Sequence, residues 1–261
     1  MEEPPFRLFA KHTLALFPCS VQTRARWDIS PRPHYLMGTL FAAQRALAEG
    51  VREICVMEFG VAGGNGLIAL QSEAEAVEQA TGVGIRVFGF DAGPGGLPNF
   101  CGDYRDHPDQ WMPGDYPMDV DRLKARLTPR TTLVLGDVRE NIERFRTEHA
   151  PSPIGFVSID VDLYSSTVAA LRVLELCPIL RHVALYFDDT HLWACNRWAG
   201  ELLAIDEFNN QHANLKIDQW RGLRHRRPFP EAFWLDHMYI CHDLESITRC
   251  TLNRKALHLS L

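Results

Sequence analysis

Short apolar runs alternate along the chain with segments whose apolar residues recur at helical spacing. The runs are rich in β-branched and aromatic residues, as buried strands are, and they cover 54–59, 85–90, 131–135, 155–159 and 182–187. Apolar residues three or four positions apart predict helices over 35–49, 67–80, 119–127, 141–148, 168–176 and 197–210. Strands that alternate with helices in this way predict a sheet of parallel strands covered on both faces.

Two more strands are predicted near the end of the chain, over 215–220 and 232–241, joined by the basic, proline-containing loop 221–228. With these strands the predicted fold is α/β: a doubly wound, mostly parallel seven-stranded sheet with a C-terminal antiparallel hairpin. In the helix over 197–210, Trp198, Leu202, Ile205 and Phe208 form an apolar stripe that we assign to the core.

The chain reads as one domain with an arm and an insertion. Residues 1–34 are irregular and contain several prolines, so we expect an N-terminal arm, with a short helix over 6–16, before a single domain over 35–261. Residues 92–126 show no clean period, and a loop this long inside a compact domain usually acts as a lid or binding segment.

Pairs of aspartates follow the fourth and fifth predicted strands: Asp160 and Asp162, then Asp188 and Asp189. Neighbouring parallel strands end at the same edge of a sheet, where open α/β sheets bind ligands. Four carboxylates brought together there repel one another unless a cation or a proton neutralises them. Oxygen ligands favour magnesium, calcium or manganese over zinc. The alternative for any one of them is a turn former or a helix cap, and we assign the caps of the helix that follows Asp162 to the hydroxyls of 165–167.

A glycine-rich turn follows the first predicted strand, with four glycines within the seven residues 60–66. Glycine lets the backbone approach a ligand closely and leaves helix N–H groups directed at it. The dinucleotide pattern G-x-G-x-x-G/A fails when begun at Gly60, because residue 62 is alanine. It fits only when begun at Gly64, several residues after the strand ends.

Acidic residues also follow the second and third predicted strands. Asp91 stands where a carboxylate can accept hydrogen bonds from both ribose hydroxyls of a nucleoside. Asp137 stands where a side chain could meet a bound adenine, and an N-cap of the following helix is the alternative. Enzymes that bind nicotinamide share an acidic residue at the position of Asp91, so this residue does not choose the cofactor.

Composition excludes several classes of protein. The formal net charge of -6 over 261 residues argues against a general nucleic-acid binder, and no apolar run approaches the length of a membrane span. The seven cysteines are scattered, without a C-x-x-C pair, which indicates reduced thiols of a cytoplasmic protein rather than a disulfide framework or zinc site.

Taken together, these motifs resemble the macrocin O-methyltransferase-like family of class I S-adenosylmethionine-dependent methyltransferases. The resemblance spans roughly 32–210, and its most specific part is the D-x-D-L-Y-x-S-T motif combined with the double aspartate. The segments that carry it are Glu58-Phe-Gly-Val-Ala-Gly-Gly64, Gly89-Phe-Asp91 with Gly96-Leu-Pro98, Ile159-Asp-Val-Asp-Leu-Tyr-Ser-Ser-Thr167 and Phe187-Asp-Asp189.

The resemblance implies S-adenosylmethionine and a magnesium ion as cofactors, and methyl transfer to hydroxyl groups, often on sugars of secondary metabolites. Carried over by position, it implies Asp160, Asp188 and Asp189 as metal ligands and Asp162 as the general base. His191, beside the double aspartate, is an alternative base or ligand. The implied cofactor site comprises Glu58, Gly60, Ala62, Gly64, Asp91, Ala92, Asp137, Val138 and Asp160.

We therefore predict a cytoplasmic, metal-dependent O-methyltransferase for a small hydroxylated molecule, with neither a nucleic acid nor a membrane as partner. Related enzymes often pair through N-terminal segments, so the arm over 1–34 is a candidate homodimer contact. One alternative is a nicotinamide-dependent oxidoreductase, which the glycine spacing and the terminal hairpin disfavour. Another is a non-catalytic protein that binds the nucleoside cofactor as a structural or regulatory ligand.

Overall fold

The computed structural model describes residues 17–191 and 193–249, together with Phe6, Arg7, Phe9 and Thr13. Most of the helix expected over 6–16 therefore lies outside the described residues. None of the described helices is both long and apolar enough to cross a membrane.

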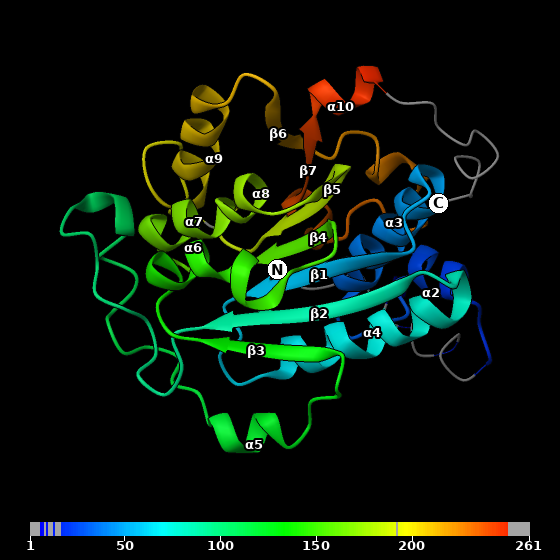
Figure 1. Ribbon diagram of the computed structural model, residues 1–261, viewed down its shortest axis with the longest axis horizontal. Coiled ribbons are helices and arrows are strands. Elements are labelled where there is room, and N and C mark those ends of the chain that lie inside the picture. The colour runs from blue at the N-terminus through cyan, green and yellow to red at the C-terminus, as the bar shows by residue number, and fades with distance from the viewer. Residues whose placement is uncertain (1–5, 8, 10–12, 14–16, 192, 250–261) are drawn as a thin grey trace.

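Seven strands form one sheet in the order β3-β2-β1-β4-β5-β7-β6 (Figure 1). The first five strands are parallel to one another, while β7 runs antiparallel to both β5 and β6. The predicted fold class is therefore confirmed, including the terminal hairpin. The strands are β1 (Glu53–Phe59), β2 (Gly84–Asp91), β3 (Thr131–Leu135), β4 (Ile154–Ile159), β5 (Ile179–Phe187), β6 (Leu215–Gln219) and β7 (Met238–Asp243).

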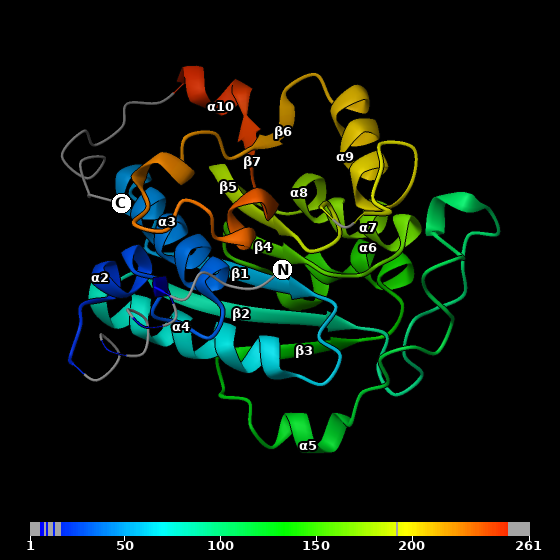
Figure 2. The ribbon, with the colours of Figure 1, turned by 180° about the vertical axis from the view of Figure 1, so that it is seen from behind.

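Helices cover both faces of the sheet, as the views in Figures 1 and 2 show from opposite sides. One face packs against α2 (Val21–Arg26), α3 (Pro33–Glu49) and α4 (Asn65–Thr81), and the other against α6 (Val138–His149), α7 (Tyr164–Leu171), α8 (Val173–Leu176) and α9 (Gly200–Gln211). The side chains of Leu36 and Leu67 belong to the first layer, and those of Phe145 and Phe208 to the second. Both layers bury apolar stripes of helices against sheet residues that alternate between the faces.

Residues 92–119 leave the carboxyl edge of the sheet after β2 and return to α5 (Val120–Lys124), which precedes β3. In Figure 1 this segment extends beyond the strand ends, with the short 3-10 helix η1 (Tyr104–Asp106) within it. Its two arms are joined because Leu97 N–H donates to the Asp115 carbonyl at 2.7 Å and Gly114 N–H donates to the Leu97 carbonyl at 2.9 Å. The segment therefore has a defined backbone path despite its lack of sequence period.

Several element boundaries differ from prediction, those of the last strand and of the helix over 197–210 among them. The strand predicted over 232–241 begins only at Met238, because Phe233–His237 form a 3-10 helix, η3, after another short 3-10 helix, η2 (Arg224–Arg226). The predicted helix over 197–210 begins at Gly200. Trp198 therefore precedes it and is 72% exposed, so its assignment to the apolar stripe was wrong. The chain ends, within the described residues, in α10 (Leu244–Arg249).

Candidate active site

A cavity of about 300 Å³ opens at the carboxyl edge of the sheet, among the ends of β1 to β5. Parallel strands that end together place the residues that follow each strand around one space, which is the usual ligand position in open α/β folds. The lining residues that follow strands are Gly60, Ala62, Asp91, Ala92, Gly136, Asp137, Val138, Asp160, Val161, Asp162, Asp188 and Asp189. The segment 92–119 adds Gly96, Leu97, Pro98, Trp111 and Tyr116.

Gly60 allows the turn after β1 to lie against the backbone that follows β4. Its φ is 88°, a left-handed conformation that glycine adopts readily, and a Cβ built there would lie 1.6 Å from the carbonyl oxygen of Asp160. No other residue fits this position without moving the backbone. Gly64, also predicted for the cofactor site, is instead the N-cap residue of α4 with a φ of 84°, and it is not part of the cavity lining.

Glu58 lies behind the glycine-rich turn. The resemblance implied a place in the cofactor site, but Glu58 does not line the cavity. The side chain is 2% exposed, and its Oε1 accepts a hydrogen bond from the Tyr35 hydroxyl at 2.6 Å. Burial raises the pKa of Glu58 to about 8, although the bond from Tyr35 and the charge of Arg32 oppose the shift. A Cβ on Gly66 would lie 1.9 Å from Oε1. Glu58 therefore lies against the start of α4 within the core, and its hydrogen bond joins it to Tyr35 of α3.

Asp91 accepts hydrogen bonds from the turn that follows β1. One carboxylate oxygen accepts from the N–H groups of Val61 at 2.9 Å and Ala62 at 2.7 Å. The other accepts from Gly93 N–H at 2.7 Å. Burial raises the pKa of Asp91, while these three bonds oppose the rise. The carboxylate thus fixes the shape of the turn and also faces the cavity.

Asp137 caps α6, as the alternative interpretation of this residue proposed. Its side chain accepts from Arg139 N–H at 2.9 Å and forms an ion pair with the Arg139 guanidinium, whose Nη1 also donates to the Asn99 carbonyl at 3.0 Å. Although burial opposes it, the bonds from Arg139 lower the pKa of Asp137. The residue lines the cavity, but its oxygens are already engaged by Arg139.

Three aspartates from two strand ends form one acidic group. Asp160, Asp162 and Asp189 each offer a carboxylate oxygen, and these oxygens all lie within 4.8 Å of one another. Burial, followed by repulsion from neighbouring aspartates, raises the pKa of Asp162 to about 8 and that of Asp189 to about 7, and it raises the pKa of Asp160 well above its ordinary value. Oδ2 of Asp189 is buried without a hydrogen-bond partner. Hard oxygen donors with an unpaired buried oxygen fit a divalent cation such as Mg²⁺.

Asp188 lines the same cavity but stands apart from this group. Its Oδ1 accepts a hydrogen bond from the Tyr186 hydroxyl at 2.7 Å. The ligand set implied by the resemblance was Asp160, Asp188 and Asp189, whereas the structure brings Asp162 together with Asp160 and Asp189. Asp188 still adds negative charge, and it is the largest charge acting on Asp160.

His191 is exposed and does not line the cavity. Its Nδ1 lies 3.0 Å from the Thr190 hydroxyl, and its ring centre lies 5.0 Å from that of His237. The structure therefore places this predicted alternative base beside the acidic group, outside the cavity wall.

Several residues at the site were not predicted individually. Trp111 and Tyr116 line the cavity from a segment that the sequence marked mainly by its lack of period, while Leu97 belongs to the Gly96-Leu-Pro98 motif of the resemblance. Glu201, in the first turn of α9, is 1% exposed, and its Oε2 accepts from the N–H of Asp189 at 2.8 Å. The sequence did not predict this contact, because Glu201 lies in a helix that follows the last parallel strand.

Comparison with known proteins adds evidence about the fold. No protein-family model matches the sequence, and no curated protein matches it. Among solved structures, a crystal structure of CalS11, calicheamicin methyltransferase, is 23% identical over 93% of this chain and 94% of its own, with a TM-score of 0.53. The chain has the methyltransferase fold.

Two further solved structures resemble the chain more distantly. An apo structure of CalS11, there described as TDP-rhamnose 3'-O-methyltransferase, is 22% identical over 93% of this chain and 96% of its own, with a TM-score of 0.47. An O-methyltransferase from Bacillus cereus in complex with SAH is 14% identical over 92% of this chain and 91% of its own, with a TM-score of 0.42.

Proposed function

We propose that the protein is an S-adenosylmethionine-dependent O-methyltransferase that acts on a hydroxyl of a small molecule, such as a sugar or a secondary metabolite, with Mg²⁺ or another hard divalent cation. The observation that carries the proposal is the position of the acidic group. Asp160 and Asp162 line the same cavity as Gly60 and Asp91, which follow the two strands that shape the nucleoside side of this fold.

The β1–β2 side of the cavity offers a suitable place for the cofactor. Gly60 leaves room for close approach. Asp91 keeps one lone pair of Oδ1 free, because its carboxylate already accepts the three N–H groups that fix the surrounding turn. The apolar side chains of Leu97 and Pro98 cover this space from segment 92–119. A sulfonium methyl is already activated, so the main task of the protein is to align the acceptor oxygen with the S–CH3 bond. Such positioning supplies on the order of 7–11 kcal/mol.

The acidic group supplies the acid–base chemistry. Asp160 and Asp189 would hold the cation, and Asp162, the third carboxylate of the group, would take the proton of the acceptor hydroxyl. When bound, a divalent cation lowers the pKa of a hydroxyl that touches it. A carboxylate that accepts the proton contributes roughly 10²–10⁴-fold to the rate. Asp188, engaged by the Tyr186 hydroxyl, adds negative charge beside the cation without joining the group.

Binding and turnover test the proposal separately. We expect S-adenosylhomocysteine to raise the melting temperature of the protein in thermal-shift assays and NAD to leave it unchanged, with Mg²⁺ adding a further increase. Incubation with S-adenosylmethionine labelled in the methyl group, Mg²⁺ and a panel of hydroxylated sugars and phenols should yield a labelled product, which EDTA suppresses. Stabilisation by NAD alone would identify an oxidoreductase. Stabilisation by S-adenosylhomocysteine without transfer to any acceptor would identify a cofactor-binding protein that is not an enzyme.

A further inference from the structure

The N-terminus of α7 receives its cap from a residue far away in the sequence. Its own N-cap residue, Leu163, makes no side-chain hydrogen bond, so the prediction that the hydroxyls of 165–167 serve as caps was wrong. Instead, Ser165 N–H donates to Oδ1 of Asp106 at 2.8 Å, and the Ser165 hydroxyl donates to Oδ2 at 3.1 Å. Asp106 precedes Ser165 by 59 residues and is 0% exposed. A carboxylate at a helix N-terminus satisfies free N–H groups and opposes the positive end of the helix dipole.

Asp106 belongs to segment 92–119, which contributes lining residues to the cavity. Asp106 ends η1 within segment 92–119, and its Oδ2 also accepts from the N–H of Cys101. Leu97 precedes η1 in this segment and Tyr116 follows it, and both line the cavity. Asp106 therefore joins the segment that contains these lining residues to the first turn of α7.

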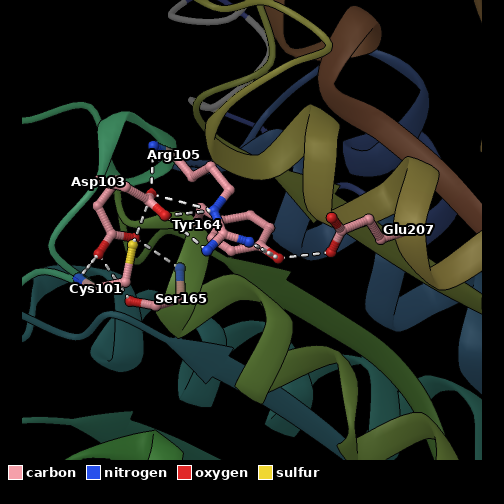
Figure 3. A network of polar contacts seen from close by, with 7 residues as sticks. Cys101, Asp103, Arg105, Tyr164, Ser165 and Glu207 are labelled. Atoms are coloured by element: carbon pink, nitrogen blue, oxygen red, sulfur yellow. Dashed lines mark hydrogen bonds and ion pairs between the residues drawn. The ribbon is translucent and has the colours of Figure 1, made fainter.

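A second, more exposed contact accompanies this one, as Figure 3 shows. The Arg105 guanidinium donates to the Tyr164 hydroxyl at 3.3 Å and lies 4.8 Å from the centre of its ring. The Tyr164 hydroxyl in turn donates to Glu207 of α9 at 2.6 Å. In Figure 3, Ser165 lies beside Cys101, while Arg105 extends over Tyr164. The segment is thus attached at both residues that begin α7.

The turn before α7 needs support from both sides. Asp162 has a φ of 60°, a conformation that costs free energy for a residue other than glycine. On the strand side, Asp160 N–H donates to the Phe59 carbonyl at 2.9 Å. On the helix side, the described contacts that fix the first turn of α7 to the rest of the protein converge on Ser165 and Tyr164. Release of this turn would let Asp162 relax away from Asp160 and Asp189.

We propose that Asp106 is a positioning residue: by capping α7 from segment 92–119, it holds Asp162 in the acidic group and keeps the cavity wall docked. The significance of that group for methyl transfer rests on the proposed function. The mechanical part of the inference does not, because the cap and the turn exist without any ligand.

Amide hydrogen exchange of the full chain tests the mechanical part. Asp106→Ala should speed exchange of peptides that cover 160–168 by about tenfold, since hydrogen bonds to a charged group contribute about 1.5–3 kcal/mol. Asp106→Asn keeps one oxygen acceptor for Ser165 N–H, so exchange should return to within about threefold of the wild type. Asp109→Ala is the matched control, because Asp109 is an exposed carboxylate of the same segment and forms no hydrogen bond or ion pair with α7 among the described contacts. It should leave exchange over 160–168 unchanged.

Calorimetric titration with Mg²⁺ tests the consequence for the acidic group. We expect Asp106→Ala to weaken Mg²⁺ affinity about tenfold and Asp106→Asn to restore it to within about threefold. Wild-type exchange over 160–168 in Asp106→Ala would overturn the positioning role and leave the proposed function standing. If Asp106→Ala exchanges faster but the wild type binds no Mg²⁺, the positioning role stands and only Mg²⁺ binding by the acidic group is overturned. If Asp106→Ala does not fold, exchange of the single Ser165 amide in the wild type is the test, because its described acceptor is Oδ1 of Asp106. This N–H should be protected by at least about tenfold, and an unprotected Ser165 N–H would overturn the inference.

Discussion

At the carboxyl edge of the sheet, the carboxylates after β1 and β2 differ from those after β4 and β5 in their hydrogen-bond partners. In the β1–β2 half, Asp91 accepts three backbone N–H groups. In the β4–β5 half, Asp160, Asp162 and Asp189 crowd together, and Oδ2 of Asp189 is buried without a partner. At the cavity wall of the first half both oxygens of Asp91 are engaged, so the shape of this wall is present before any ligand binds. Oε2 of Glu58, behind the turn, is buried without a hydrogen-bond partner. The second half is balanced only when a cation or protons neutralise it.

The basic side chains that pair with carboxylates at this edge are also unevenly placed. Arg139 forms an ion pair with Asp137 at the end of β3. Within the described residues, no lysine, arginine or histidine forms an ion pair with any aspartate of the β4–β5 half. Unpaired buried charge is costly, and proteins tolerate it chiefly at functional sites. In the proposed function, the first half would recognise the cofactor by shape and hydrogen bonds, and the second half would recognise the cation by charge.

The largest effect should come from removing one carboxylate of the unbalanced half. Asp189→Asn should lower turnover by about 10³-fold, since both cation binding and proton transfer depend on the acidic group, while affinity for S-adenosylhomocysteine changes little. Initial rates and calorimetry measure the two effects. Asp188→Asn is the matched control, because an amide oxygen still accepts from the Tyr186 hydroxyl, and we expect at most about a tenfold loss. Equal losses in both variants would show that Asp188 is a ligand.

A smaller but still large effect should follow from separating the two halves. Gly60→Ala places a Cβ 1.6 Å from the Asp160 carbonyl at a φ of 88°, so the turn and the strand end must move apart. We expect the free energy of unfolding to fall by about 3 kcal/mol, measured by urea denaturation. Gly63→Ala meets no atom within 4 Å and has no positive φ, so its effect should stay within about 1 kcal/mol. A Gly60→Ala variant whose free energy of unfolding falls by less than about 1 kcal/mol would mean that the turn after β1 and the backbone after β4 are not tightly packed.

The smallest effect, counted per unit of pH, concerns the dependence of stability on pH. The folded-state pKa of Asp162 is raised to about 8 and that of Asp189 to about 7, whereas an unfolded aspartate titrates near about 3.9. Between these values the folded protein binds more protons than the unfolded chain. The contribution of these two carboxyls to stability without divalent cations is therefore greatest below about pH 4. It is lost as the pH rises to about 8, by at most about 1.4 kcal/mol per pH unit for each carboxyl.

Urea unfolding in EDTA at pH 5, 6, 7 and 8 measures this slope. Asp162→Asn should flatten it, and saturating Mg²⁺ should offset the loss at the higher pH values. Asp109→Asn, a substitution in segment 92–119 away from the acidic group, should leave the slope unchanged. A slope that Asp162→Asn leaves unchanged would contradict the raised pKa of Asp162 and the burial and repulsion that cause it.

Strand ends were predictable, but side-chain partners were not. The four aspartates follow β4 and β5 as the sequence indicates, because the strand period and chain order determine which residues reach the edge. Which carboxylates meet depends on the left-handed turn at Asp162 and on the Tyr186 hydroxyl that engages Asp188. The pattern of apolar residues cannot predict the left-handed conformation of Asp162 or the hydrogen bond from Tyr186 to Asp188.

Glu58 and Trp198 show the same limit in the core and at the surface. Glu58 belongs to the predicted strand, but its neighbour Tyr35 lies in a helix that the sequence places before that strand. Trp198 has the right spacing for a stripe, but the helix starts two residues later at Gly200, whose φ is 59°. Periodicity predicts that an element exists more reliably than where it begins.

The sequence by itself determined the alternating elements, the parallel sheet with its terminal hairpin, and the acidic residues that follow its strands, because burial imposes a local period on every strand and helix. Only the tertiary structure decided that Asp162 joins Asp160 and Asp189, that Glu58 lies behind the turn, and that Asp106 caps α7. Each of these contacts joins residues that become neighbours only when separate elements pack, and local pattern carries no information about such distances.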